Sequence, residues 1–110
     1  MGNKYRRGEI YWISPGHGTG SEQLGDRPGI IVSNNLNNKY SRTLEVVMLT
    51  GRRKKSLPTH VRINSALRPS TALCEQITTV AKERVDRYIG TVTRREQAAI
   101  DKAMRVSISI

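Results

Sequence analysis

Short apolar runs separated by turn-forming residues are the feature that most limits how this chain can fold. The runs are rich in β-branched and aromatic residues, which favour strands. The segments between them contain Gly, Pro, Asn and Ser, which favour turns. The runs cover residues 9–13, 29–33, 43–50, 60–63, 72–80 and 85–92. Short strands at such spacing predict a small, curled antiparallel sheet or barrel.

The pattern changes to a helical one after residue 92. Thr93 and Glu96 have the spacing of a capping box, and Ile100, Ala103 and Met104 then recur at helical intervals. A C-terminal amphipathic helix is therefore expected, and residues 34–38 are expected to form a turn or a short helix. With 110 residues and no internal repeat or linker, the chain is predicted to be one mainly β (α+β) domain over residues 1–110.

The charge of the chain is strongly positive. Nineteen Lys and Arg residues against nine Asp and Glu residues give a net charge of +10. On a small domain this favours a polyanionic partner: nucleic acid, an acidic protein segment or an anionic membrane. The alternative is a basic surface that only keeps the chain soluble. Clustering of the cations favours a polyanion, and the densest cluster is Arg52, Arg53, Lys54 and Lys55.

Cysteine and histidine are scarce. Cys74 has no partner for an intramolecular disulfide, which suits a reducing compartment. A structural zinc site needs about four Cys or His ligands, and the chain offers Cys74, His17 and His60. No metal or cofactor is therefore expected. Residues 1–7 are not followed by a long apolar stretch, so neither a signal peptide nor a membrane span is predicted, and the cytoplasm is the expected location.

A glycine-rich segment over residues 16–25 resembles a phosphate-binding loop only superficially. A Walker loop requires Gly-Lys-Ser/Thr before a helix, whereas Gly20 is followed by Ser21 and then by a predicted strand. A dinucleotide-binding fingerprint also requires a following helix. The segment ends at Arg27, whose planar guanidinium could bind two phosphate oxygens. The alternative is an ion pair between Arg27 and Asp26 or another carboxylate.

Several segments, taken in order, resemble the MazF/PemK family of toxin endoribonucleases. The resemblance extends over nearly the whole chain and rests on their order rather than on one decisive motif. The segments are Arg7-Gly8-Glu9-Ile10-Tyr11-Trp12, Gly20-Ser21-Glu22-Gln23, Arg27-Pro28, Val32-Ser33-Asn34, Val46-Val47-Met48-Leu49-Thr50, Leu57-Pro58-Thr59-His60-Val61 and Cys74-Glu75-Gln76-Ile77.

The resemblance implies a fold, a reaction and partners. The fold would be an SH3-like antiparallel β-barrel with a C-terminal helix, usually in a homodimer. The reaction would be metal-independent, sequence-specific cleavage of single-stranded RNA, in which the 2′-OH attacks the phosphate and leaves a cyclic phosphate and a 5′-OH. The catalytic residues would be Arg27, stabilising phosphate charge, and Thr50, bonding the phosphate or the 2′-OH. Without the resemblance, Thr50 reads as a strand-end turn cap. An acidic antitoxin would compete with RNA for the basic surface.

Further RNA-binding residues are expected around these two. Glu22 and Glu75 are acid–base candidates or, alternatively, ion-pair partners. Gln23 and Gln76 could read base edges or cap backbone groups. His17 is a less favoured proton shuttle, and His60 is expected to serve the structure or the rim of the groove. The complete predicted RNA-binding set is Ser21, Glu22, Gln23, Arg52, Arg53, Lys54, Lys55, Glu75 and Gln76.

The chain also departs from the family pattern. Leu73, Thr78 and Ala81 stand where members of the family carry charged residues, so the substrate motif or the activity could differ. The second hypothesis is therefore a non-catalytic binder of nucleic acid or of DNA gyrase on the same fold. A DNA-binding regulator is disfavoured, because no helix-turn-helix pattern is present.

Overall fold

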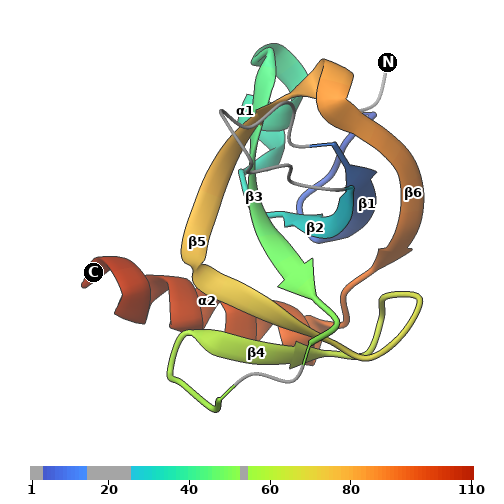
Figure 1. The fold of residues 1–110 in the computed structure, drawn as a ribbon. Coiled ribbons are helices and arrows are strands. Elements are labelled where there is room, and N and C mark those ends of the chain that lie inside the picture. The colour runs from blue at the N-terminus through green and yellow to red at the C-terminus, as the bar shows by residue number, and fades with distance from the viewer. Residues whose placement is uncertain (1–3, 15–25, 53–54) are drawn as a thin grey trace, which may run out of the picture.

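A computed structural model describes residues 4–14, 26–52 and 55–110 of the chain (Figure 1). The elements, in chain order, are β1 (Glu9–Ile13), β2 (Arg27–Ile31), α1 (Asn35–Tyr40), β3 (Thr43–Thr50), β4 (His60–Ile63), β5 (Ser70–Ala81), a 3-10 turn (Lys82–Arg84), β6 (Val85–Thr91) and α2 (Arg94–Ile108). The prediction of a mainly β chain with a C-terminal helix is confirmed.

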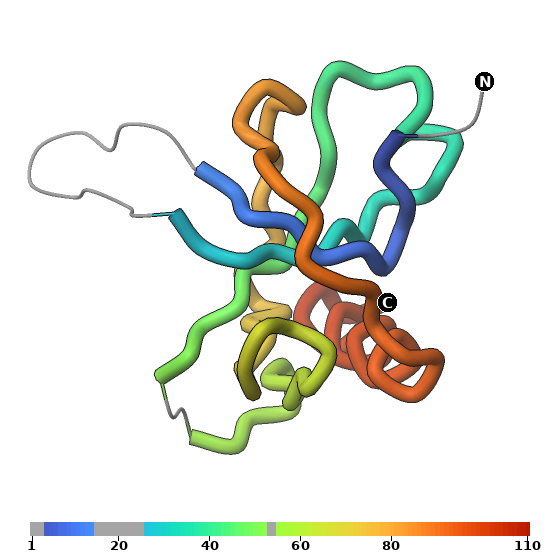
Figure 2. The backbone as a smooth tube through the Cα atoms, turned by 90° about the vertical axis from the view of Figure 1, so that its right-hand side faces the viewer, coloured from blue at the N-terminus to red at the C-terminus, as the bar shows by residue number. Residues whose placement is uncertain are grey.

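The strands form one curled antiparallel sheet in the order β4-β5-β3-β2-β1-β6. Figures 1 and 2 show how the curl brings β6 round toward the segment that follows β4. Gly90 of β6 lies so close to this segment that an added Cβ would be 2.6 Å from the carbonyl oxygen of Ser65. A glycine is required at that contact because any side chain would collide with backbone.

Two buried apolar clusters stabilise the sheet from its two sides. Alternation along β3 places Val47 and Leu49 in the first cluster, and Val46 and Met48 in the second. The first cluster includes Ile100 of α2, and this helix packs against β4 and β5. The strands in the middle of the sheet are therefore covered on both faces, as their continuous apolar runs predict.

Helix α2 begins as predicted. The Thr93 side chain accepts a hydrogen bond from the Glu96 backbone N–H, and the Glu96 side chain accepts one from the Thr93 backbone. Ile100 and Ala103 are buried. The helix has fifteen residues, and within the described segments no helix is long and apolar enough to cross a membrane.

Three strands have boundaries that differ from the prediction, and β6 differs least, because it ends at Thr91 rather than at residue 92. Strand β2 covers Arg27–Ile31 rather than 29–33, so Pro28 lies inside it. The ladder with β3 begins only at Gly29, so the missing N–H of Pro28 does not interrupt it. Strand β5 is longer than predicted at both ends. Its register against β3 also shifts between Val47 and Leu49, which leaves the residues around Glu75 outside that ladder.

Candidate active site

Arg27 and Thr50 come together where β2 begins and β3 ends. The β2–β3 register pairs Gly29 with Met48, and continuing it by two residues places Arg27 opposite Thr50. Both residues line a cavity of about 380 Å³, called here the polar pocket, together with Asp26, Gly51 and Arg52. Trp12, Pro28, Leu49 and Arg68 complete its lining. Two residues that are far apart in the sequence thus meet in one site.

Thr50 has a defined orientation. Its hydroxyl oxygen accepts a hydrogen bond of 3.2 Å from the backbone N–H of Arg52. This is the turn-capping contact that a strand-end threonine commonly makes. The contact uses an oxygen lone pair and leaves the hydroxyl proton available for a second partner. Capping the turn and donating a hydrogen bond to a ligand are therefore compatible roles.

The polar pocket is rich in positive charge. Among the described residues, its lining contains three arginines and one carboxylate. These are Arg27, Arg52 and Arg68, and Asp26. Arg27 and Arg52 are exposed. Arg27 makes no ion pair with any residue that the structure describes, so the predicted alternative of an Arg27–Asp26 pair is not realised there. Three guanidinium groups around one cavity favour a phosphate ligand, because each guanidinium can donate hydrogen bonds to two phosphate oxygens.

A second cavity, called here the apolar pocket, adjoins the first. Its volume is about 260 Å³, and it shares Trp12, Pro28, Leu49, Gly51 and Arg68 with the polar pocket. Its separate wall comes from Ala66 and Leu67, in the segment between β4 and β5, and from Ser70, the first residue of β5. Neither Trp12 nor Arg68 is a predicted site residue. Trp12 stands in the first family-like segment without an assigned role, and no sequence signal marks Arg68. The curl of the sheet brings the two residues together in this lining.

Glu75 lies in a different polar contact. Its carboxylate is 3.0 Å from His60 Nε2, and His60 Nδ1 is 2.8 Å from the carbonyl oxygen of Lys55. Burial raises the pKa of Glu75, but hydrogen bonds from its own backbone, His60 and Thr59 lower it below the ordinary value overall. Glu75 thus makes a polar contact with His60, which is an ion pair only when the imidazole is protonated, and His60 anchors the end of the basic loop. Glu75 and Gln76 do not line the polar pocket.

The remaining predicted RNA-binding residues are only partly described. Arg52 and Lys55 are exposed, as expected for a solvent-facing basic loop. The other predicted residues, and the proton-shuttle candidate His17, lie outside the described part of the chain. These are Ser21, Glu22, Gln23, Arg53 and Lys54.

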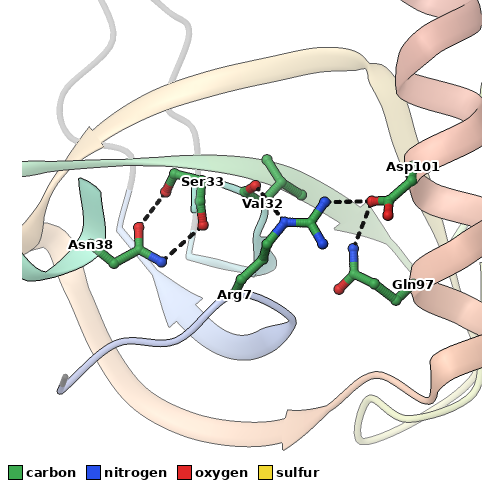
Figure 3. Close-up of polar contacts among 6 residues, drawn as sticks. All are labelled: Arg7, Val32, Ser33, Asn38, Gln97 and Asp101. Atoms are coloured by element: carbon green, nitrogen blue, oxygen red, sulfur yellow. Dashed lines mark hydrogen bonds and ion pairs between the residues drawn. The ribbon is translucent and has the colours of Figure 1, made fainter. Parts of the chain in front are cut away.

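Arg7, from the first family-like segment, makes contacts that hold parts of the fold together. Figure 3 shows it reaching from the N-terminal segment to α2, where its Nη2 is 2.5 Å from Asp101 Oδ1. Its Nε donates to the Val32 carbonyl at 3.2 Å, and Gln97 donates to the same Asp101 oxygen at 2.9 Å. Gly8 follows with φ +93°, a conformation that other residues adopt only with strain. This segment therefore connects the sheet to α2.

Cys74 is buried within the first apolar cluster. Burial, with smaller contributions from Glu75 and Asp101, raises the pKa of the Cys74 thiol to about 12. The thiolate, which is the nucleophilic form, is therefore strongly disfavoured. In the described segments, no three His, Cys, Asp or Glu residues are grouped so that they could hold a metal ion.

Comparison with solved structures defines the class of protein. An endoribonuclease from a Mycobacterial species, in complex with its cognate antitoxin, matches with a TM-score of 0.82 and 27% identity over 96% of both chains. A second Mycobacterial endoribonuclease matches with a TM-score of 0.82 and 25% identity over 100% of this chain and 96% of that one. MazF from Deinococcus radiodurans shares the fold, with a TM-score of 0.82 at 17% identity over 96% and 97% of the two chains. The fold is thus that of small toxin endoribonucleases.

The family follows from the sequence itself. The model of the PemK-like, MazF-like toxins of type II toxin-antitoxin systems matches residues 6–108. The chain belongs to this family, and the resemblance inferred from the ordered segments is confirmed.

Proposed function

We propose that this toxin is a sequence-specific endoribonuclease that cleaves single-stranded RNA without a metal ion, with Arg27 and Thr50 as its catalytic residues. The observation that carries the proposal is the meeting of these two side chains in a pocket lined by three arginines. A pure RNA binder needs positive charge but does not need a hydroxyl group fixed beside it. The similarity to Mycobacterial endoribonucleases supports the same reaction class.

The proposed reaction is a transfer within the RNA backbone. The 2′-oxygen of one nucleotide forms a bond to the adjacent phosphorus while the bond from phosphorus to the 5′-oxygen breaks. A base takes the proton of the 2′-OH, and an acid gives a proton to the leaving 5′-oxygen. The products are a 2′,3′-cyclic phosphate and a 5′-OH end. No water is consumed in this step.

Arg27 and Thr50 would act on the charge that develops at phosphorus. The phosphate gains negative charge on its non-bridging oxygens in the transition state, and fixed donors aimed at these oxygens lower the barrier. Arg27 offers a planar pair of donors, and Thr50 offers a hydroxyl already oriented by Arg52 N–H. Because a guanidinium keeps its proton in proteins, Arg27 serves charge stabilisation better than proton abstraction.

The proposal includes partners and a location. A protein of net charge +10 attracts polyanions, so an acidic antitoxin segment could occupy the same groove as RNA and inhibit cleavage by competition. One similar Mycobacterial endoribonuclease has been solved with its cognate antitoxin, which supports this pairing. A homodimer in the cytoplasm is the form in which we expect the toxin to act.

The test is cleavage of a long single-stranded RNA in EDTA by the wild type and by variants of the pocket. Arg27→Ala should lower kcat/KM by about a hundredfold or more, as expected for loss of one transition-state donor. Thr50→Val should lower it by about tenfold or more, and Thr50→Ser, which keeps the hydroxyl, should restore most of the rate. Arg42→Ala is the matched control, because Arg42 is exposed and precedes β3 at the end of the strand opposite to Thr50.

The outcomes separate the two candidate functions. Cleavage at a few fixed sites, lost in Arg27→Ala and kept in Arg42→Ala, would support the ribonuclease. Salt-sensitive RNA binding without any cleavage would instead support the non-catalytic binder, with Leu73, Thr78 and Ala81 as the departures that explain it. Cleavage that disappears with EDTA would contradict metal independence.

A further inference from the structure

The apolar pocket has no role in the proposed phosphate chemistry. Asp26, Arg27 and Arg52 line the polar pocket alone, whereas Ala66, Leu67 and Ser70 line the apolar pocket alone. Since five lining residues are common to both pockets, the two adjoin. Together they are called here the groove, which has a cationic half and an apolar half. A ligand that fills both halves must itself combine an anionic group with an apolar one.

The walls of the apolar pocket suit a flat ring. Trp12 is part of the lining, and the Arg87 guanidinium lies 5.7 Å from the centroid of its ring. The guanidinium of Arg68 lies over Gly51, where an added Cβ would be 3.5 Å from its Nε and Nη2. Unstacked nucleobases commonly pack on aromatic rings and on guanidinium planes. Leu67, which is 70% exposed, forms an apolar outer wall that a base could cover.

The wall is held in place from α2. The Glu96 carboxylate accepts hydrogen bonds from the Asn64 backbone N–H at 2.7 Å and from the Ser65 hydroxyl at 2.5 Å. Ser70 closes the other end of the segment by donating to the Arg68 carbonyl at 3.0 Å. A pocket that discriminates between ligands needs such support, because a wall that moves accommodates any shape.

We infer that the apolar pocket receives one nucleobase of the bound RNA, from a nucleotide next to the phosphate held by Arg27, and that Leu67 and Arg68 select this base. The inference rests on the proposed function, because that function places the scissile phosphate at Arg27. A nucleotide joins an anionic phosphate to a flat, weakly polar ring, which is the combination that the two halves of the groove present. Leu67 and Arg68 would thus be specificity-determining residues, and Trp12 would supply the stacking surface.

The test asks whether the apolar pocket and one particular base of the RNA contribute to affinity together. The probe is a short single-stranded RNA carrying the preferred cleavage site, with 2′-deoxyribose at the cleaved nucleotide so that it binds without reacting. An abasic residue is placed at each position in turn, and affinity is measured by fluorescence anisotropy. For the wild type, loss of the selected base should weaken binding by about tenfold. For Leu67→Ser and Arg68→Ala, removal of that same base should have little effect.

One variant serves as a control for this coupling. Leu36→Ser makes the same change at a leucine on α1 that is 71% exposed and lines neither pocket. This variant should keep the full tenfold sensitivity to removal of the base.

The results distinguish this inference from the proposed function. Equal sensitivity to base removal at every position, in the wild type and in Leu67→Ser alike, would overturn the inference even if the RNA is cleaved. If the wild type cleaves nothing, the proposed function fails, and the same abasic scan on an RNA selected for binding still decides whether the pocket holds a base. Weaker binding of an acidic peptide, but not of RNA, in Leu67→Ser would assign the pocket to a protein partner instead.

Discussion

Cys74 illustrates how burial determines the chemistry of a single residue. It stands in the segment that resembles the family, directly before Glu75, yet its side chain is inside the apolar cluster and the pKa of its thiol is raised to about 12. We predict that a thiol reagent at mildly alkaline pH labels the folded protein about a thousandfold more slowly than the unfolded chain, because so little thiolate is present. Labelling is followed by mass spectrometry.

A control separates burial from a failure of the reagent. Ser14→Cys adds a thiol at an exposed position, and this variant should take up one label in the folded state and a second only on unfolding. Labelling of the wild type at the rate of Ser14→Cys would show that Cys74 is accessible and that burial does not suppress its thiolate.

At the residue scale, the sequence predicts the catalytic pair but not its surroundings. Arg27 and Thr50 were accessible to prediction because the ordered segments carry them, and the β2–β3 register then brings them together. Trp12 also stands in one of these segments, but the resemblance assigns it no role, and Arg68 lies outside all of them. Arg68 lines the pocket only because the segment after β4 folds back toward Gly51, and such a long-range contact leaves no pattern in the neighbouring residues.

At the element scale, Glu96 connects the start of α2 to the wall of the apolar pocket. Its carboxylate accepts from Thr93 N, Asn64 N and Ser65 Oγ. Burial opposes the charged form, but these hydrogen bonds outweigh burial and lower the pKa of Glu96 below its ordinary value. A lowered pKa in the folded state stabilises the fold above the unfolded pKa of about 4.3, and this stabilisation is lost as pH falls through the folded pKa.

We therefore predict a pH-dependent cost for Glu96→Gln. At neutral pH the variant should lose about 1–3 kcal/mol of unfolding free energy, the range for hydrogen bonds to a charged acceptor. The gap to the wild type should shrink in acid, where Glu96 of the wild type is also neutral. Urea unfolding at several pH values measures this. Glu83→Gln, at an exposed position of the 3-10 turn, is the control, and a gap that stays constant with pH would contradict the charge argument.

The strands differ in how well local sequence predicts them. The strands 43–50 and 60–63 have the predicted boundaries, because turn residues flank both and their side chains follow the pattern of buried and exposed faces. The shift in β2 arises from Pro28, which reads as a strand breaker but stands before the β3 ladder begins. The irregular register of β5 depends on pairing with both β3 and β4, and neither partner is visible from the sequence of β5 alone.

At the scale of the whole molecule, charge should govern RNA affinity through its location rather than its total. The curled sheet places Arg27, Arg52 and Arg68 in one pocket, and the cluster Arg52, Arg53, Lys54 and Lys55 follows directly after Thr50 in the chain. Each phosphate contact with single-stranded nucleic acid contributes about 0.7 to the slope of log affinity against log salt concentration. Replacing all four cluster residues by Gln should therefore weaken RNA binding and reduce the slope by up to about 2.8.

A second variant with the same net charge tests whether location matters. It carries Gln at four exposed cations outside the cluster: Lys39, Arg42, Arg94 and Arg95. Both variants have a net charge of +6, since each removes four positive charges from +10. If the cluster contacts the RNA backbone, only the variant that lacks the cluster should show a weaker salt dependence. The slope reports the counterions that are released where cations contact phosphates. Equal slopes for the two variants would mean that the protein attracts RNA by its overall field, and the groove beside Arg27 would then need another source of affinity.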